Sequence, residues 1–249
     1  MGKRVSAPTI KVRGLKQAVG LLLLSAAVIA ALFYVPVTID GITYNSYLGH
    51  RVLKVDDDLE KAVVRPGTRK IDKAFANHKK LTAVVLPDSI KKIPIGAFEN
   101  CTALQSAELP ADLETIGGAA FQGCSRLVSV KIPAGVSSIG AVAFKNCSGL
   151  EAIEIPEGVK TIDTACFLNC DNLKNVTLPG GLTEIRNYAF SDCDNLETIN
   201  LPDSLNTIGK GAFSKCPKLR GVRIPAGVSD IGNGAFDPAA PTETANGNN

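Results

Sequence analysis

The feature that most limits what this chain can fold into is a repeat of 23 residues. From residue 81 the sequence divides, without insertion or deletion, into seven units that begin at Leu81, Leu104, Leu127, Leu150, Leu173, Leu196 and Leu219. In every unit position 1 is Leu, position 7 is Pro, position 13 is Ile and position 18 is Phe. A fixed period of this length predicts a solenoid, in which each coil covers the apolar side chains of the next.

The spacing inside one unit indicates the shape of a coil. Positions 4 and 6 are apolar around an exposed position 5, which predicts a half-buried strand that the Pro at position 7 ends. Positions 10 and 13 predict a second short extended segment. Positions 16 to 19, typified by Val142-Ala143-Phe144-Lys145, predict a short helical or 3₁₀ turn. The expected fold is a β-rich α/β solenoid, a right-handed leucine-rich-repeat coil of about eight units of 22–23 residues.

The repeat also predicts where the solenoid begins and ends. Residues 59–80 fit a divergent first coil that is one residue shorter, so the solenoid is expected to cover residues 59–241. Upstream, residues 38–58 predict a β cap with an Asp40-Gly41 turn, which would cover the open edge of the first coil. Residues 242–249 are polar and Gly-containing, and are expected to be a disordered tail.

An apolar segment precedes the cap. Residues 18–37 carry no charge, and 20 residues of helix would cover about 30 Å, the thickness of the hydrocarbon core of a bilayer. Three interpretations compete: an uncleaved transmembrane signal-anchor, a cleaved signal peptide and a buried core helix. The positive charges before the segment are Lys3, Arg4, Lys11, Arg13 and Lys16. The positive-inside rule then places residues 1–17 in the cytoplasm and the body outside it, either membrane-anchored at the cell surface or secreted after cleavage.

Composition argues against several classes of function. The five early positive charges leave 22 basic and 24 acidic residues for the rest of the chain, which is not the footprint of a nucleic-acid-binding protein. With two His and no Trp, the chain has little material for His-based catalysis or an aromatic ligand cage. No phosphate loop, nucleophile elbow or calcium loop is present. We therefore expect no enzyme activity, no cofactor, no metal site and no small-molecule substrate.

The repeat resembles a known family. The form LxxVxIPxxVxxIGxxAFxNC of the BspA-like leucine-rich repeat, also called the Treponema-type repeat, is matched almost letter for letter by Leu127–Cys147. The resemblance covers most of the chain. It implies a surface or secreted protein, mostly bacterial, and some members resemble adhesins that bind host matrix proteins or other bacteria. It carries over no catalytic residue and identifies no ligand.

Six cysteines recur every 23 residues at position 21, namely Cys101, Cys124, Cys147, Cys170, Cys193 and Cys216. Equivalent positions on successive coils lie about 4.8 Å apart with parallel Cβ vectors, whereas a disulfide requires Cβ atoms about 3.5–4.5 Å apart. The prediction is a ladder of buried free thiols, each able to donate a weak hydrogen bond. A seventh, Cys166, replaces an Ala before the repeat Phe and is interpreted as a core substitution rather than a thiol switch.

The exposed face of the predicted strands is the candidate partner-binding site, because solenoids bind through the sheets that their repeats build. Charges of opposite sign alternate along positions 2 and 5, and the candidate residues are Glu108, Lys131, Glu154, Lys174, Glu197, Arg220 and Arg223. Two interpretations remain open. The charges could pair between neighbouring rungs and form a self-neutralised wall, or they could form a mixed-charge surface that recognises a protein partner.

The functional hypothesis is a non-enzymatic cell-surface or exported protein that mediates protein–protein interaction or adhesion, held at the membrane by residues 18–37. Its partner would be a protein, such as an extracellular matrix component or another surface protein. The alternative is a rigid structural subunit or spacer of a membrane-associated envelope assembly.

Overall fold

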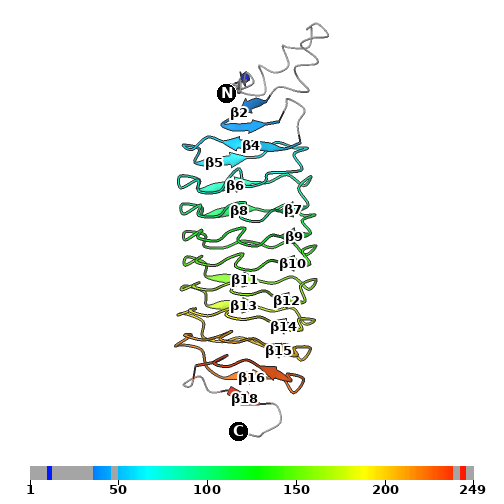
Figure 1. Cartoon of the computed structure of the whole chain (residues 1–249), viewed down its shortest axis with the longest axis vertical. Helices are drawn as coiled ribbons and strands as arrows, with labels where there is room; N and C mark the ends of the chain where they lie inside the picture. Colours follow the sequence, from blue (N-terminus) through cyan, green and yellow to red (C-terminus); the bar gives the residue numbers. More distant parts are fainter. Residues whose placement is uncertain (1–9, 13–35, 46–49, 238–241, 245–249) are drawn as a thin grey trace, which may run out of the picture.

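The protein folds as a β-solenoid, a straight rod of stacked coils with residues 36–45 at one end and residues 242–244 at the other (Figure 1). The structure is a computed structural model, and it describes residues 10–12, 36–45, 50–237 and 242–244. Each coil lies on the previous one and contributes short strands to parallel ladders that run along the rod. The predicted solenoid is therefore confirmed, whereas the predicted α component is not.

The first side of the rod, called here the first sheet face, is formed by positions 3 to 6 of the repeat. Its strands are paired in parallel between neighbouring coils, with registers such as Ala152↔Asn175. They are β5 (Lys61–Val63), β6 (Ala83–Val85), β8 (Ser106–Glu108), β11 (Ala152–Glu154), β13 (Asn175–Thr177) and β16 (Val222–Ile224). The middle residue of β6, β8 and β11 is buried and its neighbours point outward, which is the alternation that the sequence predicts.

The second side is formed by positions 12 and 13, where each coil adds a strand of two residues. These strands are β7 (Lys92–Ile93), β9 (Thr115–Ile116), β10 (Ser138–Ile139), β12 (Thr161–Ile162), β14 (Glu184–Ile185), β15 (Thr207–Ile208) and β17 (Asp230–Ile231). They pair in parallel, with the Ile of one strand beside the Ile of the next. In β7 to β15 this Ile is buried, whereas Ile231 in the last strand is 45% exposed.

The third side shows where the sequence prediction was wrong. The described residues contain no helix, and φ is positive at positions 16 and 20, with 53° at Val142 and 60° at Asn146. Consequently the N–H groups at positions 16, 18 and 20 donate to the next coil, as in Val142 to Thr164 (2.9 Å), Phe144 to Cys166 (2.9 Å) and Asn146 to Leu168 (2.8 Å). A helix would turn these groups back into their own coil. The chain instead gains a third ladder between coils.

The core is one continuous apolar column. Eight phenylalanines stack along it as seven successive ring pairs, with centroids 5.1–5.4 Å apart, so the chain makes about seven turns from Phe75 to Phe236. The Leu at position 1 and the Cys at position 21 are buried beside them in every complete coil up to Leu219. No coil could bury these side chains alone, which is why the stacking of coils holds the fold together.

A small antiparallel sheet covers the N-terminal end of the column. β2 (Val37–Ile39) and β3 (Ile42–Tyr44) form a hairpin whose turn residues, Asp40 and Gly41, have positive φ of 49° and 78°. β4 (Val52–Val55) pairs with β3. His78 attaches this cap to the first coil, since one ring nitrogen lies 3.0 Å from the carbonyl oxygen of Val55. The cap removes the open edge that a stack of parallel coils would otherwise expose.

Two strands at the ends bear on the predicted segments. β1 (Ile10–Val12) pairs in parallel with β2, and β18 (Thr242–Thr244), within the predicted disordered tail, pairs in parallel with β16. Of the predicted membrane segment, residues 18–35 lie outside the described residues, and Val37 belongs to β2. No helix in the described part of the chain is long and apolar enough to cross a membrane.

Candidate functional site

The seven candidate partner-binding residues all lie exposed on the first sheet face. Glu108, Glu154 and Arg223 are in strands β8, β11 and β16, so their side chains point straight out of the sheet. Lys131 and Glu197 belong to coils in which no strand is formed on this face, and the position-2 residues Lys174 and Arg220 lie just before β13 and β16. The repeat thus aligns them in two columns parallel to the rod axis.

These residues do not neutralise one another. In the described part of the chain, none of the seven forms an ion pair; Arg220 donates instead to the carbonyl oxygen of its neighbour Leu219 at 2.8 Å. An exposed pair contributes about 0–1 kcal/mol, so the lack of pairs on this face costs the fold little. The ion pairs between neighbouring rungs that a self-neutralised face requires are therefore not found. The charged groups of the two columns can contact a partner.

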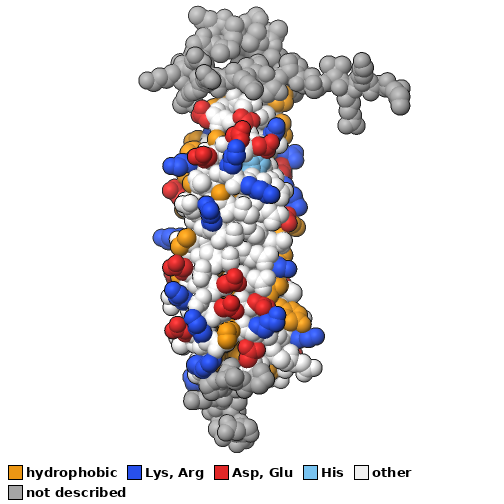
Figure 2. Space-filling view, turned by 90° about the vertical axis from the view of Figure 1, so that its left-hand side faces the viewer, with side chains coloured by type: hydrophobic (Ala, Val, Ile, Leu, Met, Phe, Trp, Pro, Cys, Tyr) orange, Lys and Arg blue, Asp and Glu red, His pale blue; other side chains and the backbone are white. Residues whose placement is uncertain are grey.

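Ion pairs between coils lie elsewhere on the rod. Arg186 pairs with Asp163 at 3.2 Å, and Lys215 pairs with Asp192 at 3.0 Å, each across one step of the repeat. These residues belong to positions 14 and 20, on the second and third sides. On the side of the rod shown in Figure 2, Lys and Arg lie among Asp and Glu near both ends of the described structure.

The six position-21 cysteines lie one above another along the core. All seven cysteines are buried and free. Each position-21 thiol donates to the carbonyl oxygen of the Phe in the preceding coil, with sulfur–oxygen distances of 2.9–3.3 Å. The thiol thus adds a hydrogen bond between coils to a buried carbonyl group, which at Phe98, Phe121 and Phe144 also accepts a backbone N–H of its own coil. This satisfies the polar hydrogen of the buried thiol and gives a physical reason for Cys at this position. Cys166 takes the place of an Ala and is fully buried.

Burial keeps these thiols protonated. Desolvation raises the pKa of the Cys101 thiol to about 12. It also raises the pKa of Cys124, Cys147 and Cys170 well above the usual range. The pKa of Cys193 is raised chiefly by its hydrogen bond with the Cys216 thiol and then by burial. A protonated thiol is a poor nucleophile and a poor metal ligand, so the ladder is structural.

Other polar residues do not converge on a reaction centre or a metal. Among the described residues, no group of three or more His, Cys, Asp or Glu side chains could hold a metal ion. His78, next to the thiol ladder, is buried, and its two ring nitrogens lie 3.2 Å from the carbonyl oxygen of Ala76 and 3.0 Å from that of Val55. A neutral ring donates to one of the two, so His78 has polar partners in the structure and is no free ligand for a metal.

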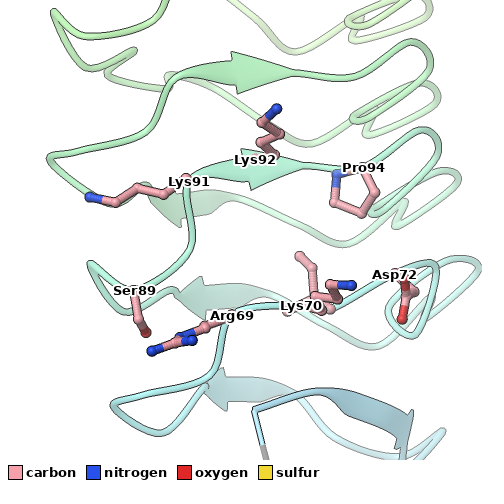
Figure 3. Close-up of a pocket in the computed structure, with 8 residues that line it drawn as sticks. Arg69, Lys70, Asp72, Ser89, Lys91, Lys92 and Pro94 are labelled. Atoms are coloured by element: carbon pink, nitrogen blue, oxygen red, sulfur yellow. The ribbon is translucent and has the colours of Figure 1, made fainter.

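The structure reveals a basic hollow on the second side that was not predicted from the sequence. It has a volume of about 420 Å³ and lies between two neighbouring coils, lined by Arg69, Lys70, Ile71, Asp72, Ser89, Lys91, Lys92 and Pro94 (Figure 3). No backbone hydrogen bond joins residues 69–72 to residues 89–94 in the described structure, and β7 is the end strand of its sheet. Pro94 has no N–H to donate, and the first coil is one residue short. The ladder of backbone hydrogen bonds on the second side is therefore interrupted between these two coils.

The repeat units of this chain match a known family. The model of the BspA type leucine rich repeat region matches residues 69–167 and 119–242, in six copies. The chain belongs to the BspA-type leucine-rich repeat family. This match covers the coils that carry the candidate residues and the thiol ladder. No curated protein sequence is significantly similar to the chain.

Solved structures agree with this BspA-type assignment. A leucine rich repeat protein of T. pallidum is 32% identical with a TM-score of 0.60, and the match covers 64% of this chain and 78% of that one. A leucine-rich repeat protein from Bacteroides ovatus is 27% identical with a TM-score of 0.63, covering 77% of this chain and 57% of that chain. A leucine rich cell surface protein from Faecalibacterium prausnitzii has the same fold, with 24% identity, a TM-score of 0.60, and coverage of 84% and 76%.

The sequence of this BspA-type chain does contain a signal for the hollow. Arg69-Lys70 and Lys91-Lys92 are two basic doublets 22 residues apart, which is the offset between the first coil and the second. Doublets at that spacing must fall on neighbouring rungs of the rod. A segment of two residues has no periodicity of its own, whereas the longer strands of the first sheet face show a clear alternation. The doublets therefore did not predict a site.

Proposed function

We propose that this chain is a non-enzymatic surface protein whose solenoid binds other proteins, and that residues 18–37 hold it at the membrane with the solenoid outside the cytoplasm. Membership of a leucine-rich repeat family supports the general role, since such solenoids generally present extended surfaces to protein partners. The observation that carries the proposal is that the seven charged residues of the first sheet face are exposed and have no ion-pair partner within the described part of the chain.

The surface favours moderate, distributed binding. The face has few exposed large apolar side chains besides Val63 and Val128, and no aromatic anchor. Interfaces without such anchors lack the residues that usually dominate affinity. Charged contacts spread over several rungs would each contribute little, and many copies on one surface would raise the effective avidity. This is the behaviour expected of an adhesion module.

Reversing two of the face charges tests the binding role. Lys131→Glu combined with Lys174→Glu is expected to weaken attachment of cells to a matrix- or cell-coated surface by about tenfold or more at low salt, since several rungs act together. Both side chains are exposed, so the thermal midpoint should shift by no more than a few degrees. The matched control is Lys145→Glu with Lys210→Glu, away from the first sheet face, since neither side chain forms an ion pair in the described part of the chain. Attachment that persists unchanged in the first variant would remove the binding role from this face.

Topology is tested separately in intact cells. Protease added outside is expected to digest the chain beyond Val37, while an epitope within residues 1–16 survives, because the uncharged segment would separate the two. The competing arrangement is the pairing of β1 with β2, which places Ile10–Val12 beside Val37–Ile39. A single crossing between these strands excludes that pairing. An epitope digested together with the body, or a body protected together with the epitope, would contradict the anchored topology.

The second candidate is a rigid spacer of an envelope assembly. The continuous core favours it, because one apolar cluster runs from the cap at Ile42 to Ala235 near the last turn, without a hinge. A spacer works through its length and its ends. The charge reversal above would then leave function unchanged, whereas deletion of one complete 23-residue unit would impair it.

A further inference from the structure

The basic hollow carries charge that the protein itself does not neutralise. Lys91 pairs with Asp112 at 2.6 Å, and Asp72, the hollow's one acid, pairs with Arg51. Arg69, Lys70 and Lys92 have no acidic partner among the described residues. Figure 3 shows Arg69 and Lys70 on one coil and Lys92 on the next, where the Lys92 side chain points away from the first two. Three cations without an acidic partner on two neighbouring coils make the local potential positive, which favours an anionic ligand.

The charge around the hollow is part of a larger asymmetry. Residues 50–95 contain 11 Lys and Arg against 6 Asp and Glu, whereas residues 96–237 contain 11 against 16. The first two coils are therefore the positive end of a rod that is otherwise negative. A negatively charged partner would be attracted to this end and repelled by the rest, which fixes where along the rod it docks.

An apolar shoulder lies directly beside the cations. A second shallow hollow of about 500 Å³ shares Asp72, Lys92 and Pro94 with the first, and is completed by Lys73, Ile93, Ile95, Thr115 and Gly117. Ile95 is 66% exposed, which is unusual for an Ile in this protein. Because Gly117 stands in the next coil, no side chain from that position covers Ile95. The surface therefore offers an aliphatic contact at Ile95 next to the positively charged side chains of the basic hollow.

We propose that the basic hollow and its apolar shoulder bind a segment of a partner protein that carries acidic and aliphatic side chains together. This inference rests on the proposed function and names the site and chemistry of one partner contact. Carboxylates of the segment would pair with Lys70, Lys92 and Arg69, and an adjacent aliphatic side chain would pack on Ile95. A sulfated polysaccharide has no aliphatic side chain to place there. A flat lipid surface matches poorly a concave site confined to two coils.

The test uses the full chain in detergent solution and a fluorescein-labelled peptide of alternating Glu and Leu as the probe. At about 50 mM salt the peptide is expected to raise fluorescence anisotropy on binding, and about 0.5 M salt should weaken that binding tenfold or more. Lys70→Glu with Lys92→Glu should weaken it by about tenfold or more, and Ile95→Ser by about threefold or more. The matched control, Lys174→Glu with Arg220→Glu on the first sheet face, should change it less than about twofold.

Comparison probes decide against the other ligand classes. A peptide of alternating Lys and Leu should not bind, and an all-Glu peptide should bind more weakly than the Glu-Leu peptide, because it cannot use the shoulder. The inference is overturned if the Glu-Leu peptide binds no better than the Lys-Leu peptide. It is equally overturned if the Ile95→Ser variant keeps full affinity, or if heparin or phosphatidylglycerol in mixed micelles binds through Lys70 and Lys92 while the peptide does not.

The outcome is separable from that of the proposed function. Cell attachment that depends on Lys131 and Lys174, with no peptide binding at the hollow, would leave the proposed function standing and remove this inference. Peptide binding at the hollow with attachment insensitive to Lys131 and Lys174 would support the inference and move the partner contact from the first sheet face to the second side.

Discussion

Phe144→Ala is expected to destabilise the protein by about 3–5 kcal/mol, measured as the change in the free energy of unfolding by urea. The side chain is fully buried, and its ring stacks between those of Phe121 and Phe167, at centroid distances of 5.3 and 5.4 Å. Truncation would leave a cavity in the middle of the column, and the coils above and below are held apart by their own backbone ladders, so the gap cannot close.

The matched control for this variant is Phe236→Ala. Phe236 stacks on Phe213 alone among the described residues, and it is only partly buried. We expect less than half the loss seen for Phe144→Ala. Because coils interact mainly with their neighbours, the central variant should also broaden the unfolding transition, as the two halves of the rod become less strongly coupled. Equal losses for the two variants would show that the ring column is not a continuous source of stability.

The repeat predicts some features of the coil and not others. The coil, the buried Phe and the thiol ladder follow from period and burial alone, because a position repeated in every unit must stack on itself. The turn at positions 16 to 20 did not follow. Ala, Phe and Lys at such spacing also suit a helix, and non-Gly residues such as Val142 and Asn146 rarely adopt positive φ. The hydrogen bonds between coils impose that conformation, and they exist only after stacking.

The candidate site was predictable in position but not in its interactions. The alternation of strand residues placed Glu108, Glu154 and Arg223 on one exposed face, as observed. Whether neighbouring charges pair depends on rotamers and solvent, which a sequence does not contain. The basic hollow depends on a departure from the repeat, namely the short first coil and Pro94. A period describes what all units share, so it does not predict features that only one unit has. A site that binds one partner, however, has to differ from the repeat around it.

Alkaline pH is expected to destabilise the protein through the thiol ladder. Folding raises the pKa of the buried thiols well above that of a free Cys, about 8.5. Below about pH 8.5 both states are protonated and the contribution to stability is complete. As the pH rises toward the folded-state pKa, the unfolded chain loses these protons and the folded chain keeps them, so stability falls. Each such thiol should cost about 2 kcal/mol between pH 7 and pH 10, and several together approach the whole stability of an ordinary domain.

Cys147→Ala isolates one thiol of the ladder. Cys147 donates to the carbonyl oxygen of Phe121 at 3.1 Å, so the variant should be less stable than the parent at pH 7, because it loses this hydrogen bond between coils and the buried volume of the thiol, while the N–H of Cys124 still donates to Phe121. Between pH 7 and pH 10, however, the variant should lose about 2 kcal/mol less than the parent, since it has one fewer thiol to ionise on unfolding. Lys and Tyr titrate equally in both proteins, so their effects cancel in this difference. The measurement is urea unfolding at both pH values. If both proteins lose the same stability between these pH values, burial does not hold Cys147 protonated, and the ladder has a different basis from the one derived from its hydrogen bonds.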